Sequence, residues 1–313
     1  MNANIAISVQ NLTKSFARAK KQASIEAVRP LSFDVQRGEL FGLIGPDGAG
    51  KTTLFRMLTT LILPDSGSAS VDGFDIVRDY KEIRQRVGYM PGRFSLYQDL
   101  TVEENLLFFA TLFNTTVEEN YEFIKDIYSQ IEPFKTRKAG KLSGGMKQKL
   151  ALSCALIHKP SVLFLDEPTT GVDPVSRKEF WEMLKKLKAG GMTIMASTPY
   201  MDEAVLCDRI ALMQDGKLLD SNTPAQITEA YPWTLWAVYA SDMFRLLIDL
   251  RKYPLTAACY SFGEFHHLSL KEEGDKEDLR RYLQNLQHAN IEIHSITPNI
   301  EDCFMQFGKE GIS

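Results

Sequence analysis

The sequence has few cysteines, and their spacing excludes several kinds of site. Four occur among 313 residues, and consecutive ones are 53, 52 and 44 positions apart: Cys154, Cys207, Cys259 and Cys303. A small disulfide scaffold needs a far higher density, and zinc or redox motifs need pairs a few residues apart. The sequence therefore predicts reduced thiols and a cytoplasmic location.

Long apolar runs and an excess of one charge are also missing. The most apolar long stretch, residues 233–250, is interrupted by Asp242, Arg245 and Asp249. The N-terminus has no basic segment followed by an apolar one, so we expect neither a transmembrane segment nor a secretory signal. Lys and Arg number 36 against 40 Asp and Glu, a net charge of −4. No nucleic-acid partner is expected, because such partners usually require a basic surface.

What is present is a mixed α/β pattern that changes character late in the chain. Short apolar segments alternate with amphipathic helices, which are expected at 51–60, 102–113, 121–131, 146–157 and 174–188. Such alternation predicts a parallel sheet covered by helices. After about residue 225 the expected order is strand–helix–strand–strand–helix–strand, the ferredoxin-like α+β arrangement. We therefore predict a domain at 1–225, with a helical subdomain at about 92–160, and a small accessory domain at 226–313.

The most informative motif is a glycine-rich loop between an apolar strand and a helix. It has the pattern G-x-x-x-x-G-K-[ST] and consists of Gly45, Pro46, Asp47, Gly48, Ala49, Gly50, Lys51 and Thr52, followed by Thr53. Glycines allow backbone N–H groups to turn toward phosphate oxygens, and the helix N-terminus adds its dipole. Lys51 is expected to neutralise the phosphates, and the Thr52 hydroxyl to ligate Mg²⁺. A glycine-rich turn by chance is the alternative, disfavoured because strand, helix and Lys-Thr pair occur together.

Two further segments carry groups that a phosphate site needs. Asp166 and Glu167 end an apolar strand, 115 residues after Lys51 in the case of Asp166. Asp166 is expected to hold Mg²⁺, and Glu167 to act as the catalytic carboxylate that polarises the attacking water. Taken alone, the strand end is equally compatible with ordinary surface acids. Residues 143–145 (Ser-Gly-Gly) precede a helix and indicate either a second anion-binding helix start or a plain N-cap.

Together these motifs resemble those of the ATP-binding subunit of an ABC transporter. They match the family's Walker A motif, signature, Walker B motif and D-loop at 45–52, 142–148, 162–167 and 171–174. The match covers about residues 4–225. Residues 99–105 and 200–204 are similar to the ABC-2 type, drug-exporter-like branch, as is the end of the chain.

The resemblance implies a P-loop NTPase (ABC ATPase) fold and an ATP hydrolase that drives an ABC-2 type exporter. In this family two ATPase domains, identical or different, close head to tail on two ATP molecules with Mg²⁺. Permease subunits convert the closure into transport, which places the chain on the inner face of the membrane. Each ATP lies between one chain's Walker A motif and residues of the other chain, here Ser143, Gly144, Gly145 and Asp173. Phe16 falls where the family places an aromatic ring against adenine, with core packing as the alternative.

Two positions depart from the family pattern. Gly92 stands where the family usually has the Gln that contacts Mg²⁺ and the attacking water. Pro199 stands where it usually has the His that contacts the γ-phosphate. Neither carries a side-chain donor. Our interpretation is a weakened ATP site in this chain and a different second ATPase subunit; tolerated variation in an active enzyme is the alternative.

Residues 93–100, with two aromatic side chains, are predicted to form the docking surface for the permease. A folded-back apolar loop is the alternative there. Two other functions stay open. One is a soluble, non-transport ABC protein, although such proteins usually carry two ATPase halves or long inserted helices. The other is an ATP-binding module with little hydrolysis, which the two departures favour and Glu167 disfavours.

Overall fold

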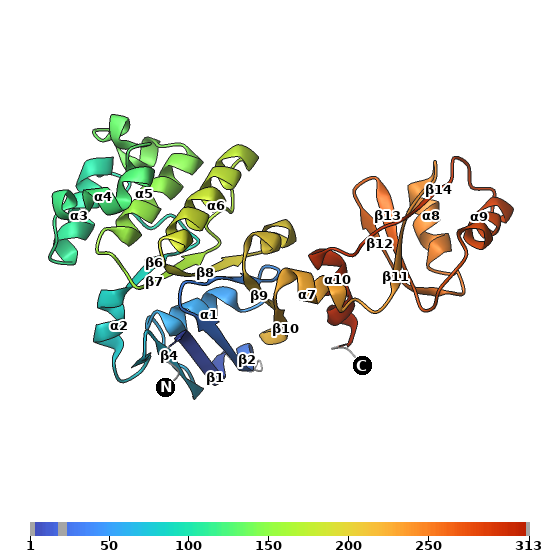
Figure 1. Ribbon diagram of the computed structural model, residues 1–313, viewed down its shortest axis with the longest axis horizontal. Coiled ribbons are helices and arrows are strands. Elements are labelled where there is room, and N and C mark those ends of the chain that lie inside the picture. Colours follow the sequence, from blue (N-terminus) through green and yellow to red (C-terminus); the bar gives the residue numbers. More distant parts are fainter. Residues whose placement is uncertain (1–3, 18–23, 311–313) are drawn as a thin grey trace. The chain divides into compact units, whose positions relative to one another are not determined.

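The structure is a computed structural model that describes residues 4–17 and 24–310. The chain divides into two compact units, Met1–Thr223 and Pro224–Ser313, each with its own hydrophobic core (Figure 1). In the described ranges, no helix is long and apolar enough to cross a membrane.

A six-stranded sheet forms the centre of the first unit, with the strand order β10-β9-β3-β8-β7-β6. The parallel strands are β9 (Arg209–Gln214), β3 (Leu40–Ile44), β8 (Thr193–Thr198), β7 (Val162–Asp166) and β6 (Val87–Met90). The edge strand β10 (Lys217–Asn222) is antiparallel to β9. Every residue of β3, β7 and β8 is buried, as expected for a parallel sheet covered on both faces. The carboxyl ends of these three strands therefore meet at one edge of the sheet.

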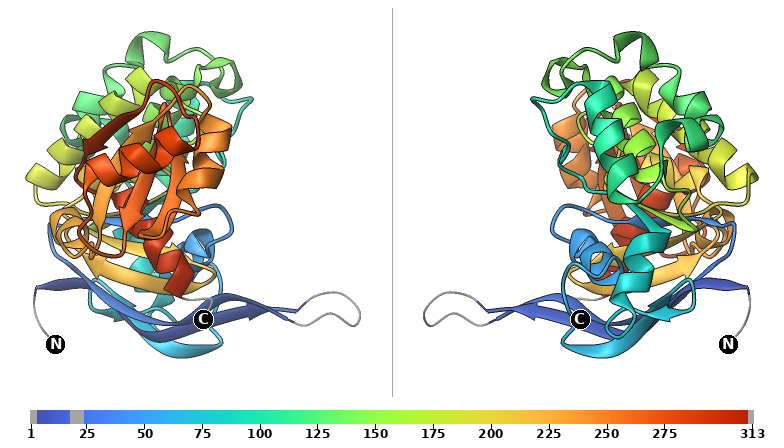
Figure 2. Two further views of the ribbon diagram at one scale, coloured as in Figure 1. Left: turned by 90° about the vertical axis from the view of Figure 1, so that its right-hand side faces the viewer. Right: turned by 90° about the vertical axis from the view of Figure 1, so that its left-hand side faces the viewer.

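A second sheet of the first unit is antiparallel, in the order β2-β1-β4-β5. Its strands are β1 (Ile5–Phe16), β2 (Ile25–Gln36), β4 (Ser66–Val71) and β5 (Phe74–Asp75). Helix α1 (Lys51–Leu58) contacts β2 and β4, and its Phe55 meets Phe164 of β7 edge-on at 5.7 Å between ring centroids. One core thus joins both sheets. The far ends of β1 and β2 extend beyond the rest of this unit (Figure 2).

The remaining elements of the first unit are helical. They are α2 (Tyr80–Arg86), α3 (Val102–Leu112), α4 (Val117–Tyr128), α5 (Gly144–Leu156) and α6 (Pro174–Ala189), with the short turns η1 (Glu132–Phe134), η2 (Ala139–Lys141) and η3 (Met201–Leu206). Helices α3, α4 and α5 pack on one another in the region predicted to be a helical subdomain (green in Figure 1).

Two of these helices begin with a capping box. Thr101 Oγ1 accepts from Glu104 N at 3.2 Å and Glu104 Oε2 accepts from Thr101 N at 2.7 Å, which confirms the predicted start of α3. Thr116 and Glu119 form the same arrangement at α4. Because this second box satisfies the first N–H groups, α4 starts at Val117, four residues before the predicted position.

The second unit has the predicted strand–helix–strand–strand–helix–strand order. Its elements are β11 (Thr234–Tyr239), α8 (Met243–Leu250), β12 (Thr256–Phe262), β13 (Phe265–Leu270), α9 (Lys276–Asn285) and β14 (Glu292–Ser295). The sheet is antiparallel throughout, in the order β12-β13-β11-β14. Leu residues of α8 and α9 pack on it. Helices α7 (Pro224–Glu229) and α10 (Ile300–Glu310), which flank these elements in sequence, contact each other.

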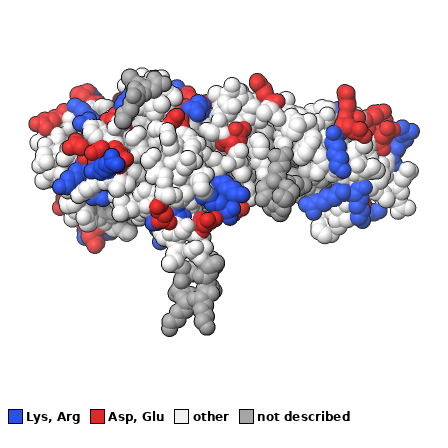
Figure 3. All heavy atoms as spheres, turned by 90° about the horizontal axis from the view of Figure 1, so that it is seen from below, with Lys and Arg blue, Asp and Glu red and all other residues white. Residues whose placement is uncertain are grey.

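The cysteines are buried, and the surface charges of the first unit are mixed on the face that Figure 3 shows. Cys154, Cys207, Cys259 and Cys303 are all buried thiols, two in each unit. Burial raises the pKa of the Cys154 and Cys207 thiols. Acidic and basic side chains are interspersed on this face, with neither sign of charge predominating.

Candidate nucleotide-binding site

The glycine-rich loop connects the end of β3 to the start of α1, and its glycines are needed for close approach. A Cβ on Gly45 would lie 2.1 Å from the carbonyl oxygen of Met213. Gly50, the N-cap of α1, has a φ of 105°, and a Cβ there would lie 2.2 Å from the carbonyl oxygen of Ala27. Larger residues would therefore push the loop away from the strands that support it.

Lys51 lies inside this loop. It is 3% exposed, and its Nζ donates to the carbonyl oxygens of Gly45 at 2.7 Å and Pro46 at 3.0 Å. The same Nζ forms an ion pair with Glu167 Oε1 at 3.1 Å. A cation held at the mouth of a helix N-terminus provides a strong attraction for phosphate oxygens.

The two carboxylates stand at the carboxyl end of β7. Asp166 is 2% exposed, and its Oδ1 accepts a 2.7 Å hydrogen bond from Ser197 Oγ of β8. Glu167 N donates to Ser197 Oγ at 3.0 Å. Glu167 has a φ of 50°, an uncommon conformation for a residue with a side chain. Such local strain is frequent at functional sites, and here it accompanies the contact with Lys51.

The groups predicted to hold Mg²⁺ are the Asp166 carboxylate and the Thr52 hydroxyl. Among the described residues, no group of three or more His, Cys, Asp and Glu side chains could hold a metal ion. This donor set fits Mg²⁺, which usually keeps several waters and binds through one or two carboxylates and substrate phosphates. It does not fit a metal that needs a closed cage of protein ligands.

Tyr89 and Ser197 belong to this region and were missed by the sequence analysis. Burial raises the pKa of Tyr89 to about 12, and the negative charge of Asp166 adds to the effect, so the phenol stays protonated. Ser197 bonds to both residues of the Asp-Glu pair. Both residues reach this region because β6 and β8 are the neighbours of β7 in the sheet. The sequence does not reveal this strand order, so it gave no signal for either residue.

Of the two positions that depart from the family pattern, Gly92 lies beside these carboxylates and Pro199 lies next to a residue that bonds to the phosphate loop. A Cβ on Gly92 would be 3.0 Å from the carbonyl oxygen of Asp166 and 3.6 Å from Glu167 Cβ. Pro199 follows Thr198, whose carbonyl oxygen accepts from Gly45 N at 3.2 Å. Both positions therefore border the site, and neither residue offers it a polar side chain.

Residues 143–145 lie against the D-loop instead of the glycine-rich loop. Ser143 caps α5, its Oγ accepting from Met146 N at 3.3 Å. A Cβ on Gly145 would be 2.7 Å from Ser176 Oγ, on the first turn of α6. Asp173 caps α6, and the backbone hydrogen bond from Ser176 lowers the pKa of its carboxyl.

The predicted site residues thus form two separate groups in one chain. Lys51 and Glu167 are joined directly. Throughout the described part of the chain, no hydrogen bond or ion pair connects residues 143–145 to either of them. That residues 143–145 serve the nucleotide of a second chain stays a prediction.

Phe16 ends β1, and 43% of its surface is exposed, so it is not packed in the core. Lys14 Nζ lies 5.7 Å from the centre of its ring. Phe16 pairs with Ile25 of β2. Two residues further along β2, the carbonyl oxygen of Ala27 lies against Gly50 of the phosphate loop. The ring is therefore accessible on the strand pair that flanks the glycine-rich loop.

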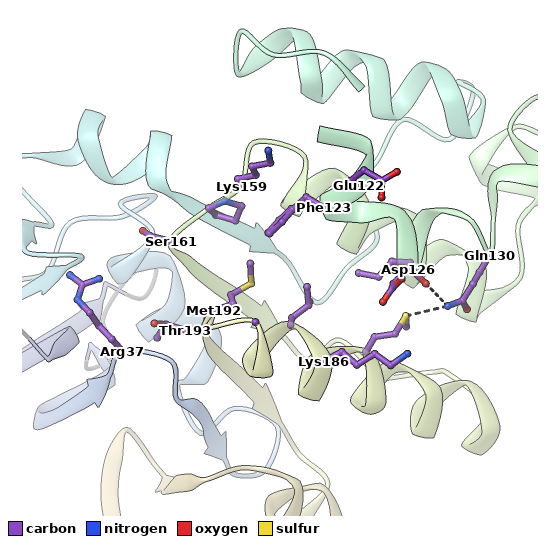
Figure 4. A pocket seen from close by; sticks show the side chains of 16 residues that line it. Arg37, Glu122, Phe123, Asp126, Gln130, Lys159, Ser161, Lys186, Met192 and Thr193 are labelled. Carbon is purple, nitrogen blue, oxygen red and sulfur yellow. Dashed lines mark hydrogen bonds between the residues drawn. The ribbon is translucent and has the colours of Figure 1, made fainter. Parts of the chain in front are cut away.

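A separate cavity of about 520 Å³ lies at the opposite ends of β7 and β8 (Figure 4). Phe123 of α4 and Met192 project into it, while Arg37, Lys159 and Asp126 bring charges of both signs. It is lined by residues at the beginning of these strands and therefore does not belong to the nucleotide site.

The sequence model of the ABC transporter family matches residues 28–170. "Nod factor export ATP-binding protein I" of Burkholderia lata is 43% identical over 288 residues, covering 90% of this chain and 92% of the relative. The chain belongs to the ABC transporter ATP-binding family. "Probable multidrug ABC transporter ATP-binding protein YbhF" of Escherichia coli is 41% identical over 307 residues, 96% of this chain. The chain spans about half of that relative's length, 51%.

Solved structures share the fold of this ABC family member. The dimeric ABC transporter cassette MJ0796 superposes with a TM-score of 0.63 at 25% sequence identity, covering 69% of this chain and 98% of that one. The ABC ATPase fold is thereby confirmed, with its parallel central sheet, antiparallel sheet and helical part.

Proposed function

We propose that the chain binds and hydrolyses ATP as the subunit that powers an ABC-2 type exporter from the inner face of the membrane. The observation that carries this proposal is the 3.1 Å contact between Lys51 in the phosphate loop and Glu167 after β7. It brings a phosphate-binding cation and a carboxylate base to one point. Both named relatives support a role in transport, and the name of the Nod factor export protein supports the direction.

In the proposed reaction, the loop amides and Lys51 bind the phosphates, and Phe16 stacks on adenine. Thr52 and Asp166 would hold Mg²⁺, which would neutralise charge on the phosphates. Glu167 accepts a proton as water attacks the γ-phosphorus and the bond to ADP breaks. In our proposal the full set of nucleotide contacts from this chain is Phe16, Gly45, Pro46, Asp47, Gly48, Ala49, Gly50, Lys51, Thr52 and Thr53. The opposite ATP receives Ser143, Gly144, Gly145 and Asp173.

We further propose that this chain's own site is weakened. Gly92 and Pro199 border Asp166, Glu167 and the loop without adding a donor to them. Ser143 and Asp173, which serve the opposite site, keep the family's residues. A different second ATPase subunit, with Gln and His at the two positions, would then carry most of the hydrolysis. An ATP-binding module with little turnover is the second candidate that these positions favour.

For the permease we propose the surface formed by residues 93–100 and the groove of about 420 Å³ beside them, which Ser95 and Leu96 line together with residues of α2, β6, α3 and α5. Leu96 is buried, but Tyr97 is 51% exposed and stacks edge-on with Phe108, their ring centroids 4.9 Å apart. An apolar, partly open groove suits an amphipathic helix of a membrane subunit. Residues 1–225 would be the ATPase domain and 226–313 an accessory domain, for which the strand order β12-β13-β11-β14 supports a ferredoxin-like fold.

The proposal is tested by separating ATP binding from ATP hydrolysis. Lys51→Ala should weaken ATP binding at least tenfold, because it removes the charge-assisted contact with the phosphates. Glu167→Gln should bind ATP like the wild type but hydrolyse it about 10²-fold more slowly, as for loss of a general base. Binding is measured with a fluorescent ATP analogue and turnover by phosphate release, in each case with and without Mg²⁺.

Two exposed residues of the same unit provide matched controls. Lys217→Ala and Glu182→Gln should leave both measurements unchanged. Wild-type binding by Lys51→Ala would contradict the nucleotide site, and wild-type hydrolysis by Glu167→Gln would contradict the assignment of the base.

A further inference from the structure

Glu203, in η3, is a buried carboxylate to which nothing above gives a role. It is 2% exposed, and its Oε2 accepts a 2.5 Å hydrogen bond from Thr198 Oγ1. Its Oε1 accepts from Thr169 Oγ1 at 2.8 Å and from Nε and Nη2 of Arg177 at 3.1 and 3.0 Å. A buried carboxylate is unfavourable unless it is paired and hydrogen-bonded. These three partners therefore fix the Glu203 side chain in one position.

The partners of Glu203 come from three segments around the nucleotide site. Thr169 is two residues beyond Glu167. Thr198 ends β8, and its carbonyl oxygen accepts from the first N–H of the phosphate loop. Arg177 is in the first turn of α6, where its N–H donates to the carbonyl oxygen of Asp173 at 2.9 Å. One carboxylate thus connects the residues after β7, the residues after β8 and the helix that Asp173 caps.

The segment 198–200 depends on this connection because Pro199 has no N–H to donate. The next backbone donor, Tyr200 N, bonds at 3.1 Å to Thr198 Oγ1, the hydroxyl that Glu203 holds. The Arg177 guanidinium also lies over the Tyr200 ring, 4.1 Å from its centre, a favourable cation–π arrangement. Side chains centred on Glu203 and Arg177 therefore fix the path of this segment.

We propose that Glu203 is a positioning residue that couples segment 198–200 to the first turn of α6. This inference rests on the proposed function, because it requires ATP in the loop 45–52 and Asp173 in the opposite site. ATP binding displaces segment 198–200, and the Glu203–Arg177 ion pair transmits the displacement to α6. The occupancy of this chain's own site thereby controls the position of the Asp173 that it presents to the other site.

Hydrogen exchange on the full chain tests the coupling, with Mg-ATP as the ligand. In the wild type, Mg-ATP should slow amide exchange both in residues 45–54 and in residues 173–178, the latter by roughly tenfold. The variant Glu203→Gln keeps the shape of the side chain and removes its charge. In this variant Mg-ATP should still slow amide exchange in residues 45–54, but it should slow exchange in residues 173–178 by less than about twofold. Steady-state kinetics should show a several-fold lower kcat with KM for ATP changed less than about twofold.

Asp202→Asn is the matched control. Its carboxylate lies 3.5 Å from the same Arg177 Nη2 but is 76% exposed, so its removal should leave the exchange response unchanged. If Glu203→Gln does not fold, Arg177→Met combined with Glu203→Gln removes both charges and should give the same loss of response.

The possible failures are distinguishable. If Mg-ATP leaves residues 45–54 unaffected in the wild type, both the proposed function and this inference are wrong. If the loop responds but residues 173–178 do not, or if they respond equally in Glu203→Gln, the coupling alone is wrong. An equal loss of response in Asp202→Asn would also contradict the specific role of Glu203.

Discussion

At the scale of single residues, the conformation of the phosphate loop depends on glycines, which have no Cβ atom. Gly45 and Gly48 are both in this loop but differ in their surroundings. A Cβ on Gly45 would collide with the carbonyl oxygen of Met213, whereas a Cβ on Gly48 would meet nothing within 4 Å. Gly48 instead has a φ of 81°, which strains any other residue.

The two glycines should therefore respond differently to alanine. We expect Gly45→Ala to lower the free energy of unfolding by roughly 2–3 kcal/mol through overpacking against a rigid strand end. Gly48→Ala should lower it by about 1 kcal/mol, from backbone strain alone. Urea unfolding of the two variants measures the difference, and equal losses would contradict the predicted collision at Gly45.

Sequence alone was sufficient to place those residues whose positions follow from local order along the chain. Lys51 and Glu167 could be proposed as partners because each follows a strand of a parallel sheet. Ser197, Tyr89 and Glu203 could not, because their contacts depend on β8 and β6 flanking β7 and on η3 folding back, which no local pattern specifies. Phe16 was equally compatible with a core position, since one aromatic residue after a strand does not reveal its exposure.

At the scale of elements, the contact between the ends of α3 and α5 includes a histidine held neutral. His158, just after α5, stacks on Phe113, just after α3, with ring centroids 3.7 Å apart. Its Nε2 is 3.1 Å from the carbonyl oxygen of Val87, an acceptor, so Nε2 carries the proton. Burial lowers the pKa of His158 to about 4.

This histidine should make the first unit less stable in mild acid. An unfolded chain binds a proton on His158 below about pH 6.5, whereas the folded chain does so only below about 4. Between these values the unfolded state holds more protons, so the free energy of unfolding should fall as the pH falls. His158→Gln keeps a donor for Val87 but cannot titrate, and should flatten this dependence.

The measurement is denaturant-dependent hydrogen exchange of β7 at several pH values from 4 to 7.5. Lys159→Gln, a change at the exposed neighbouring residue, is the control and should keep the wild-type pH dependence. A slope that persists in His158→Gln would assign the acid sensitivity to other groups.

The two ends of α4 show that the periodicity of apolar residues is insufficient to predict where a helix begins and ends. The apolar pattern located α4 but not its first turn, which carries the polar residues of a capping box. At its other end, the helix stops at Tyr128 instead of residue 131, and the chain continues through η1, which contains Pro133. Proline disrupts the regular hydrogen bonding of a helix. In the second unit the predicted order of strands and helices matches the order in the structure.

At the scale of the whole molecule, the departures at Gly92 and Pro199 predict slow turnover by this chain alone. Gly92→Gln with Pro199→His should raise its Mg-ATPase activity at least several-fold, because both donors act on charge that develops in the transition state. Gly92→Ala with Pro199→Ala is the control for volume, since a Cβ at position 92 lies only 3.0 Å from the Asp166 carbonyl oxygen.

The same experiment can contradict the weakened site. If the native chain alone already turns over at ~1–10 s⁻¹, as enzymes commonly do, and the restored chain is no faster, then the two departures are tolerated variation. A gain in the alanine control equal to that in the restored chain would assign the effect to packing.

The four buried thiols, two per unit, also act as built-in reporters of local opening. A thiol reacts with iodoacetamide only as an exposed thiolate, and all four are buried. Each alkylation therefore records an excursion of its surroundings to solvent. Because Cys154 and Cys207 lie in one compact unit and Cys259 and Cys303 in the other, mass spectrometry of the labelled sites distinguishes which unit has opened.

Saturating Mg-ATP should slow alkylation of Cys154 and Cys207, because bound ligand stabilises the closed form of the first unit. At a concentration 100 times the Kd, the alkylation rate should fall roughly 100-fold. Cys259 and Cys303 should keep their rates if their unit opens independently. Equal slowing of all four would mean that the two units open as one cooperative body. The chain's own sulfur atoms can thus report, without any substitution in the sequence, which unit nucleotide binding stabilises.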